Sequence, residues 1–207
     1  MWSDDSRTTE RARFHTLCQQ LAKETQKPHV ALSNFVASSG SDYVSSFVVG
    51  IHGADEWAKE VSEKETDPYK AIMIKAVADR LAEAFAELLH HRARVEWGYE
   101  WLNEFNHNEL IKELYRGICP APGFIQPSRT TRKSPSCSIY WKHRRVTLTE
   151  SCAMHPGAAV SGLLFSHPES RYFAISELQK DQVEDYARRK SWSIEEAEKW
   201  LGPWLGY

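Results

Sequence analysis

Residues 67–98 read DPYKAIMIKAVADRLAEAFAELLHHRARVEWG, and this stretch decides the fold because it predicts one very long helix. Asp67 can cap the free amides at the start of a helix, and Pro68 has little cost at the first helical position. No further Gly or Pro occurs before Gly98. Apolar residues recur at helical steps, at Ile72, Ala76, Leu81, Phe85, Leu88 and Leu89. A helix with such a face and several alanines is expected to lie across a sheet.

The rest of the chain mixes strand-like and helix-like patterns. Alternating or β-branched stretches predict strands at 34–37, 43–51, 146–149, 159–165 and 172–175. Apolar periodicity predicts helices at 6–23, 55–62, 108–115 and 180–190, and Ser193 with Glu196 forms a capping box that opens a last helix. Because strands and helices do not alternate regularly, we expect an α+β fold. Its mainly antiparallel, twisted sheet would carry the long helix across it, with helices at the C-terminal end.

Composition limits the size and the partners of the protein. A chain of 207 residues with 42% hydrophobic residues is expected to form a single domain over residues 1–207. The net charge of -2 gives no electrostatic reason to expect nucleic acid or an anionic membrane as a partner. No apolar run approaches the roughly 20 residues that cross a bilayer, and the first residues lack a secretory pattern. We therefore expect a cytoplasmic protein.

The cysteines and histidines do not form a recognisable site. Cys18, Cys119, Cys137 and Cys152 are scattered without a C-x-x-C pair, so free thiols are expected rather than a zinc site or a disulfide framework. His155 and His167 do not have ligand spacing with Cys152. The sequence therefore indicates no metal and no catalytic nucleophile.

Several short motifs occur in a fixed order along most of the chain. They are YKAIMIKA at 69–76, DRLAEAFAE at 79–87, PAPG at 120–123, LTES at 148–151, VSG at 160–162, FSHP at 165–168 and WLGP at 200–203. No single motif is specific, but their order is. Together they resemble the C-terminal activation domain of cobalamin-dependent methionine synthase, which binds S-adenosylmethionine.

The resemblance implies a supporting role in methionine biosynthesis. In that family the domain holds S-adenosylmethionine above the cobalamin of a neighbouring domain. A flavodoxin-like protein or a flavoprotein reductase then reduces inactive cob(II)alamin so that it can be remethylated. The cobalamin-binding domain and the electron donor are the implied partners. Because the cofactors supply the chemistry, the chain would be part of a methyltransferase but not catalytic alone.

The same resemblance assigns ligand contacts to Glu83, Ala121, Gly123, Tyr172 and Phe173. A carboxylate can meet the amino or sulfonium charge of the ligand, a glycine allows close backbone approach, and an aromatic ring can lie against a cation or a base. Each residue also has a simpler interpretation. Glu83 fits a solvated helix face, and either Tyr172 or Phe173 fits a core position on a strand.

The chain departs from the family pattern at two ligand-loop positions. The family has Arg where this chain has Cys119, and Tyr where it has Phe124. In the family, the paired N–H donors of the arginine guanidinium would hold the carboxylate of the ligand, and a thiol cannot replace them. This substitution favours an alternative function, a non-enzymatic docking module that does not bind the nucleotide.

Two longer departures favour a further alternative, a non-functional gene fragment. Residues 126–145 are basic and rich in Ser and Thr, the resemblance is lost there, and we expect a poorly ordered loop. The chain also resembles the family only from part-way through the domain. An open sheet edge and an incomplete ligand pocket are the expected consequences.

Overall fold

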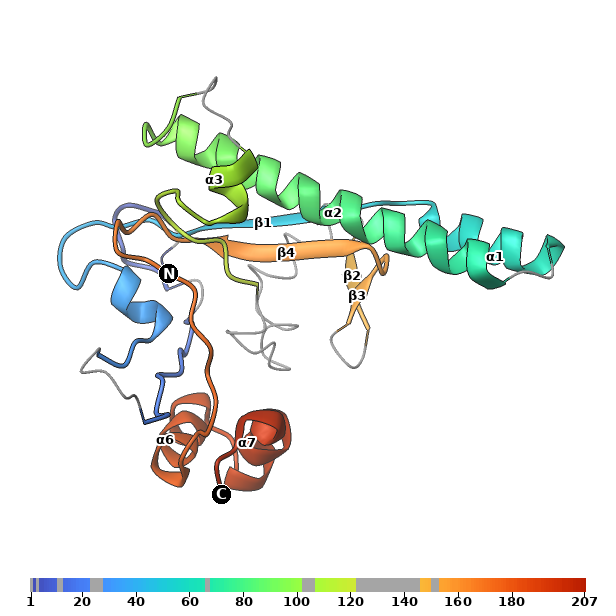
Figure 1. Cartoon of the computed structure of the whole chain (residues 1–207). Helices are drawn as coiled ribbons and strands as arrows, with labels where there is room; N and C mark the ends of the chain where they lie inside the picture. Colours follow the sequence, from blue (N-terminus) through green and yellow to red (C-terminus); the bar gives the residue numbers. More distant parts are fainter. Residues whose placement is uncertain are drawn as a thin grey trace.

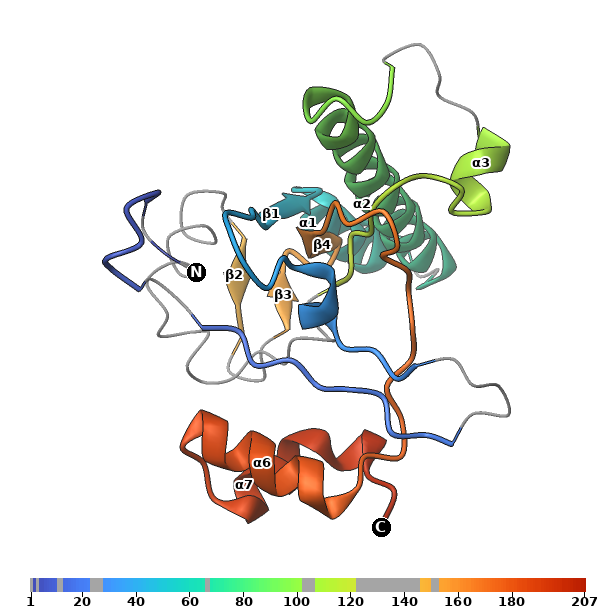
Figure 2. The same cartoon turned by 90° about the vertical axis from the view of Figure 1, so that its left-hand side faces the viewer.

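The computed structural model of the chain describes residues 2, 4–10, 13–22, 28–65, 68–101, 107–121, 146–149 and 153–207. The fold is α+β, as the sequence predicts, with one long helix lying across a small antiparallel sheet (Figure 1). Turning the molecule shows the C-terminal helices as a separate layer on the other side of the sheet from the long helix (Figure 2). Gly123, Phe124 and the predicted loop at 126–145 lie outside the described residues.

The long helix is α2, Pro68–Glu96, and it begins at the proline that the sequence marks. Every fourth residue from Ala78 through Ala82 and Ala86 is at most 5% exposed and faces the interior. A row of every fourth residue forms one packing ridge on a helix. Because this ridge consists of alanines, the helix backbone can come close to the sheet. Helix α1, Ala54–Lys64, packs beside the first half of α2.

Two strands form the sheet beneath α2. Strand β1, Ser45–Gly50, pairs antiparallel with β4, Ala159–Leu164, so that Phe47 lies opposite Gly162. A second antiparallel pair joins β2, Thr147–Leu148, to β3, Met154–His155. A short helix α3, His107–Ile111, follows α2 along the chain.

The C-terminal layer has its own core. Helix α6, Lys180–Lys190, and helix α7, Ile194–Leu201, are followed by the turn η3, Gly202–Trp204. The Ser193 hydroxyl accepts a hydrogen bond from the Glu196 amide at 3.1 Å, which confirms the predicted cap. The buried members of this core are Leu17, Leu178, Val183, Tyr186, Ala187, Ala197 and Leu201.

The predicted N-terminal helix over residues 6–23 is wrong. Residues 13–20 are extended, and Cys18 forms a β-bridge with Ala31. The side chain of Gln182 on α6 also bonds the Cys18 backbone, accepting from its amide at 2.6 Å and donating to its carbonyl at 3.0 Å. Helical spacing misled here because Phe14 and Leu17 pack into two different cores rather than onto one surface.

Two predicted strands are also absent. Residues 34–37 belong partly to a 3₁₀ helix η1, Leu32–Phe35, whose Asn34 side chain accepts a bond from the Ala31 amide. Residues 172–175 run extended, without a strand partner among the described residues. In both stretches the aromatic residues, Phe35, Tyr172 and Phe173, pack into one core cluster without a ladder. The β-like composition of these stretches therefore reflects side chains that pack into a core, not strands that pair in a sheet.

The face by which α2 meets the sheet also differs from the prediction. Ile72, Leu81, Phe85 and Leu88 were expected to pack inward, but each is between 45% and 62% exposed. Leu89 packs against the sheet core together with Ala86. The alanine row, rather than the large side chains, packs on the sheet because small side chains let the helix backbone approach it closely.

Candidate functional site

Residues 117–120 run along the outer edge of β4 and position the candidate site. Ile118 and Phe165 exchange two backbone hydrogen bonds of 3.0 Å, and the Leu163 amide donates to the Pro120 carbonyl at 3.1 Å. Gly117 enters this segment with a φ of 94°, and a Cβ there would lie 2.6 Å from the Phe165 carbonyl oxygen. Only glycine fits that conformation and that spacing. The segment is therefore fixed against the sheet.

Cys119 and Tyr172 meet at this edge, although 53 residues separate them. The Cys119 amide donates to the Tyr172 hydroxyl at 3.0 Å, and the Cys119 Sγ lies 3.1 Å from the same oxygen. Burial raises the pKa of the Cys119 thiol to about 11. The thiol is neutral at physiological pH and is therefore a poor nucleophile. Burial, followed by the contact with Cys119, also raises the pKa of Tyr172.

A buried polar cluster lies behind this contact, on the C-terminal half of α2. Glu100 accepts from Arg94 Nε at 2.8 Å, and its Oε2 lies 2.9 Å from His91 Nδ1. The Arg94 guanidinium stacks 4.1 Å from the centre of the Tyr115 ring, and His90 meets the same ring edge-on at 5.1 Å. Arg94 is 2% exposed and His90 is 1% exposed. Charged groups this deep usually need partners, and Glu100 and Tyr115 supply some of them.

Three polar atoms of this cluster remain without a hydrogen-bond partner within the described part of the chain. They are Glu87 Oε2, His90 Nδ1 and Arg94 Nη1. Burial raises the pKa of Glu87, and burial with the charges of Arg94 and His91 lowers the pKa of His90 to about 3. The electrostatic neighbours of the Cys119 thiol include Glu87 and Arg94. The cluster therefore offers unused donors and acceptors beside the Cys119–Tyr172 contact.

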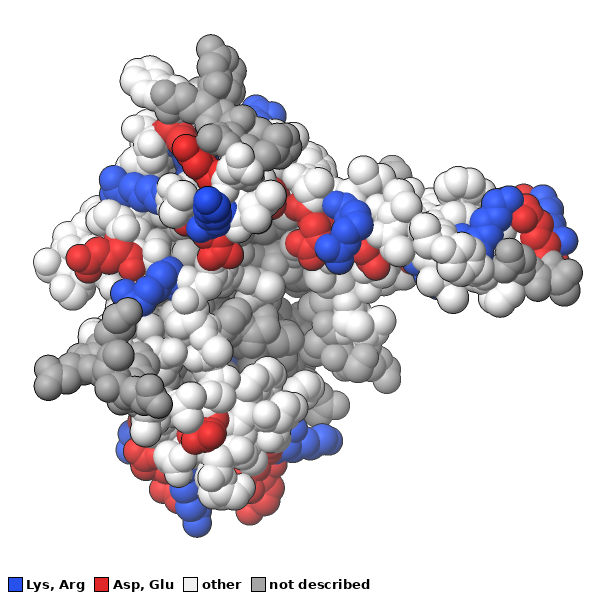
Figure 3. Space-filling model, in the orientation of Figure 1, with Lys and Arg blue, Asp and Glu red and all other residues white. Residues whose placement is uncertain are grey.

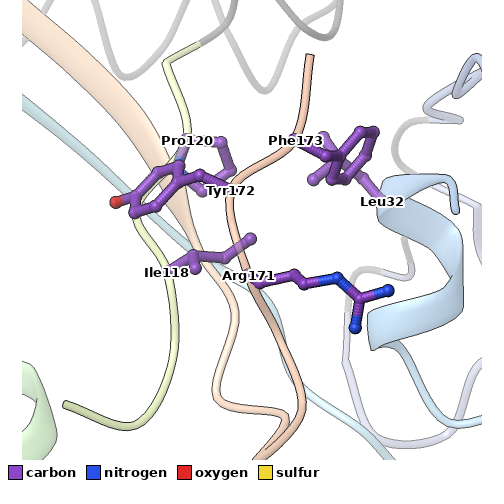
Figure 4. A pocket seen from close by; sticks show the side chains of 6 residues that line it. All are labelled: Leu32, Ile118, Pro120, Arg171, Tyr172 and Phe173. Atoms are coloured by element: carbon purple, nitrogen blue, oxygen red, sulfur yellow. The ribbon is translucent and has the colours of Figure 1, made fainter. Parts of the chain in front are cut away.

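A shallow surface hollow lies on the other side of the same segment, with about 160 Å³ of empty space that includes the open solvent above it. Its lining residues are Leu32, Ile118, Pro120, Arg171, Tyr172 and Phe173 (Figure 4). The ring of Tyr172 lies beside Pro120, and the ring of Phe173 lies beside Leu32 of η1. The described residues enclose no room for even a water molecule there, so they form one wall of a surface rather than a closed ligand pocket.

The structure brings together some of the ligand contacts that the resemblance assigns. Tyr172 lines the hollow with its ring, and its hydroxyl meets Cys119 and hydrogen-bonds the Tyr115 side chain of the polar cluster. Phe173 lies next to it in the hollow, with its ring 6.2 Å from that of Phe35. Glu83 is exposed on α2, one turn before Glu87, whose charge environment includes Glu83. Ala121 is exposed at the end of a described stretch. Gly123 lies outside the described residues, and the assigned roles remain predictions.

Sequence reasoning missed four residues of this region, Glu87, His90, Arg94 and Arg171. Glu87 follows Glu83 by one helical turn, and His90 and Arg94 continue the buried alanine row, so helical spacing alone could have found them. Arg171 is the only charged side chain among the described residues that line the hollow, and it is exposed. Its position next to Tyr172, a predicted ligand contact, was the sequence feature that could have indicated it.

Replacing Tyr172 by phenylalanine should lower the free energy of unfolding by about 1–2 kcal/mol, because the Cys119 amide then loses its acceptor in a partly buried place. Urea denaturation followed by circular dichroism measures this. Tyr43→Phe is the control, since the Tyr43 hydroxyl bonds Asp5 at an exposed position. Equal losses in the two variants would show that the Tyr172 hydroxyl does not hold the segment.

The described ranges contain neither a metal-type cluster nor a membrane-type helix. Among these residues, no group of three or more His, Cys, Asp or Glu side chains is arranged to hold a metal ion. None of the described helices has the length and apolar character needed to span a membrane.

The sequence and the fold agree with comparisons to known proteins. Residues 1–191 match the family model for the vitamin B12 dependent methionine synthase activation domain. The crystal structure of the MetH reactivation domain bound to AdoHcy superimposes with a TM-score of 0.87 at 46% sequence identity. The match covers 100% of this chain and 65% of that chain. The protein is thus an α+β domain of the reactivation-domain type. The chain belongs to the vitamin B12 dependent methionine synthase activation domain family.

Proposed function

We propose that this chain binds S-adenosylmethionine and acts as the activation domain of a cobalamin-dependent methionine synthase. The observation that carries the proposal is the 46% identity, over the whole chain, to a reactivation domain that was solved with AdoHcy, S-adenosylhomocysteine, bound. The chain spans 65% of the length of that relative. The ligand would lie at the edge where Tyr172 meets Cys119 and Pro120.

The residues at this edge suit the parts of such a ligand. The rings of Tyr172 and Phe173 offer an apolar surface for the adenine or the sulfonium group. Glu83, and behind it Glu87, offer carboxylates for the amino group. Arg171 lines the hollow and is a cation that could meet the ligand carboxylate. Ala121 and Gly123 are proposed to approach the ligand with their backbone.

Within the larger enzyme, the proposed task is to present the methyl donor to a cobalamin that a neighbouring domain holds. The cobalamin supplies the methyl-accepting chemistry when it is bound, and this chain supplies position and charge. A flavodoxin-like protein or a flavoprotein reductase is the proposed electron donor. A cytoplasmic location is also proposed, because the family resemblance places the chain in methionine synthase.

Isothermal titration calorimetry with S-adenosylhomocysteine and S-adenosylmethionine tests the proposal. We expect one site per chain for both ligands. Replacing Arg171 by glutamine should weaken binding roughly two- to fivefold, the modest effect expected when an exposed ion pair is lost. Arg116→Gln is the matched control, because that guanidinium is also exposed but stacks on Tyr99.

The outcomes separate the proposal from the docking-module alternative. Absence of heat with both ligands from a folded chain would reject nucleotide binding and favour a module that only docks on other domains. An unchanged affinity in Arg171→Gln would instead leave binding intact and remove Arg171 from the site.

A further inference from the structure

Side-chain contacts, rather than a sheet, fix the direction of the Tyr172 side chain. Residues 172–175 run extended without a strand partner among the described residues. The Tyr172 ring lies beside Pro120 in the hollow (Figure 4), and its hydroxyl accepts the 3.0 Å bond from the Cys119 amide. Two side-chain torsions set the direction of a tyrosine ring. The groups that hold the hydroxyl therefore decide how the ring faces the hollow.

Tyr115 also contacts the hydroxyl end of Tyr172. The Tyr115 side chain hydrogen-bonds Tyr172. Burial raises the pKa of both residues, so both phenols are neutral at physiological pH and each keeps a proton to donate. Two neutral hydroxyls and the Cys119 amide supply enough donors and acceptors to satisfy one another in this partly buried place. Tyr115 is thus a second group that holds the Tyr172 hydroxyl.

The ring of Tyr115 is itself held by α2. The Arg94 guanidinium stacks 4.1 Å from the centre of the ring, and His90 meets the ring edge-on at 5.1 Å. Arg94 is 2% exposed, and its Nε donates to Glu100 at 2.8 Å. Charged side chains of both signs are interspersed over the face of the molecule that Figure 3 shows, where water and salt screen them. Because Arg94 is shielded from solvent, its stack on Tyr115 is stronger than an exposed one.

We propose that Tyr115 is a positioning residue for Tyr172. Arg94 fixes the Tyr115 ring, and the Tyr115 hydroxyl fixes the Tyr172 hydroxyl, so that the Tyr172 ring presents one face to the hollow. Tyr115 is not among the described residues that line the hollow, and it therefore acts on a ligand only through Tyr172. This inference rests on the proposed function in one respect, since S-adenosylmethionine is the ligand that the Tyr172 ring would meet.

Amide hydrogen exchange, measured by NMR on the ligand-free chain, tests the positioning without any ligand. Tyr115→Phe removes one hydroxyl and keeps the ring. The Cys119 amide, which donates to the Tyr172 hydroxyl, should then exchange roughly threefold faster or more. The Ile118 amide donates to the Phe165 carbonyl at 3.0 Å and should keep its wild-type rate. An unchanged rate at Cys119 would overturn the proposal, and so would an equal rise at Ile118, which would indicate a general structural role.

Calorimetry with S-adenosylmethionine tests the effect on the ligand. Tyr115→Phe should weaken binding about two- to tenfold, the range expected for one net hydrogen bond. In a Tyr172→Phe background the same substitution should change the affinity by less than about twofold, because the hydroxyl through which Tyr115 acts is then absent. Tyr99→Phe is the matched control. Arg116 stacks on the Tyr99 ring at 4.0 Å, and this variant should leave both measurements unchanged.

The two measurements distinguish failure of this inference from failure of the proposed function. A folded wild-type chain that gives no heat with the ligand would reject the proposed function, and the exchange rate at Cys119 would then decide the role of Tyr115 alone. A chain that binds the ligand equally well after Tyr115→Phe would overturn the positioning role. Equal losses of affinity from Tyr115→Phe in the wild-type and Tyr172→Phe backgrounds would also overturn it, since Tyr115 would then act by another route.

Discussion

Replacing Cys119 by arginine is expected to tighten the binding of S-adenosylmethionine about ten- to a hundredfold. The resemblance places an arginine at this position as the fork for the ligand carboxylate. A charge-assisted hydrogen bond of this kind contributes roughly 1.5–3 kcal/mol. The structure shows a favourable setting, because one buried Glu87 oxygen has no hydrogen-bond partner among the described residues, and Glu87 belongs to the charge environment of Cys119. One edge of the new guanidinium could bond Glu87 while the other meets the ligand.

Arg94 opposes this gain because it is a second buried cation close to the site. The comparison with Cys119→Met therefore matters, since methionine adds length without charge. Calorimetry should show tightening for arginine and little change for methionine, with both variants folded by circular dichroism. If arginine binds the ligand no better than methionine does, the carboxylate lies elsewhere, and Arg171 becomes the remaining described cation beside the hollow.

Replacing Gly117 by alanine should lower the free energy of unfolding by about 3 kcal/mol. Two costs combine. The φ of 94° strains any residue with a Cβ, at about 1–2 kcal/mol, and the new Cβ would lie 2.6 Å from the Phe165 carbonyl oxygen. That oxygen accepts the 3.0 Å bond from the Ile118 amide, so moving it also disturbs the attachment of residues 117–120 to β4. The melting temperature should fall by about 6–12 °C.

Gly40→Ala separates the two costs. Gly40 also has a positive φ, 79°, but a Cβ there would meet nothing within 4 Å. It should therefore cost only the backbone strain, about 1–2 kcal/mol. Urea denaturation of both variants measures the difference. Equal destabilisation would mean that the close approach to Phe165 relaxes without cost, and the segment would then not be fixed by this glycine.

The elements predicted most reliably were those whose signals are local. Pro68 marked the start of α2, and Ser193 capped α7. The helix predicted over 180–190 has the same bounds as α6, Lys180–Lys190. Strand β4 was predicted from its apolar run. Helix capping and spacing act within a few residues, and tertiary contacts did not override them here.

The site was only partly accessible from the sequence. The order of the motifs indicated the family, and with it Glu83, the PAPG loop, Tyr172 and Phe173. The contact between Cys119 and Tyr172, and the buried cluster around Arg94, depend on segments that are far apart in the chain. The spacing of residues within one segment carries no information about contacts between distant segments.

The sequence by itself determined which stretches become helices in the second half of the chain and which family the chain resembles, because propensity, capping and motif order are properties of short segments. Only the tertiary structure decided that residues 13–20 are extended and that α2 turns its alanines, rather than its large apolar residues, to the sheet. Periodicity shows that a helix has an apolar face, but the distance to the opposing surface selects the face that packs there. That selection leaves Val77, Leu81 and Phe85 exposed to solvent.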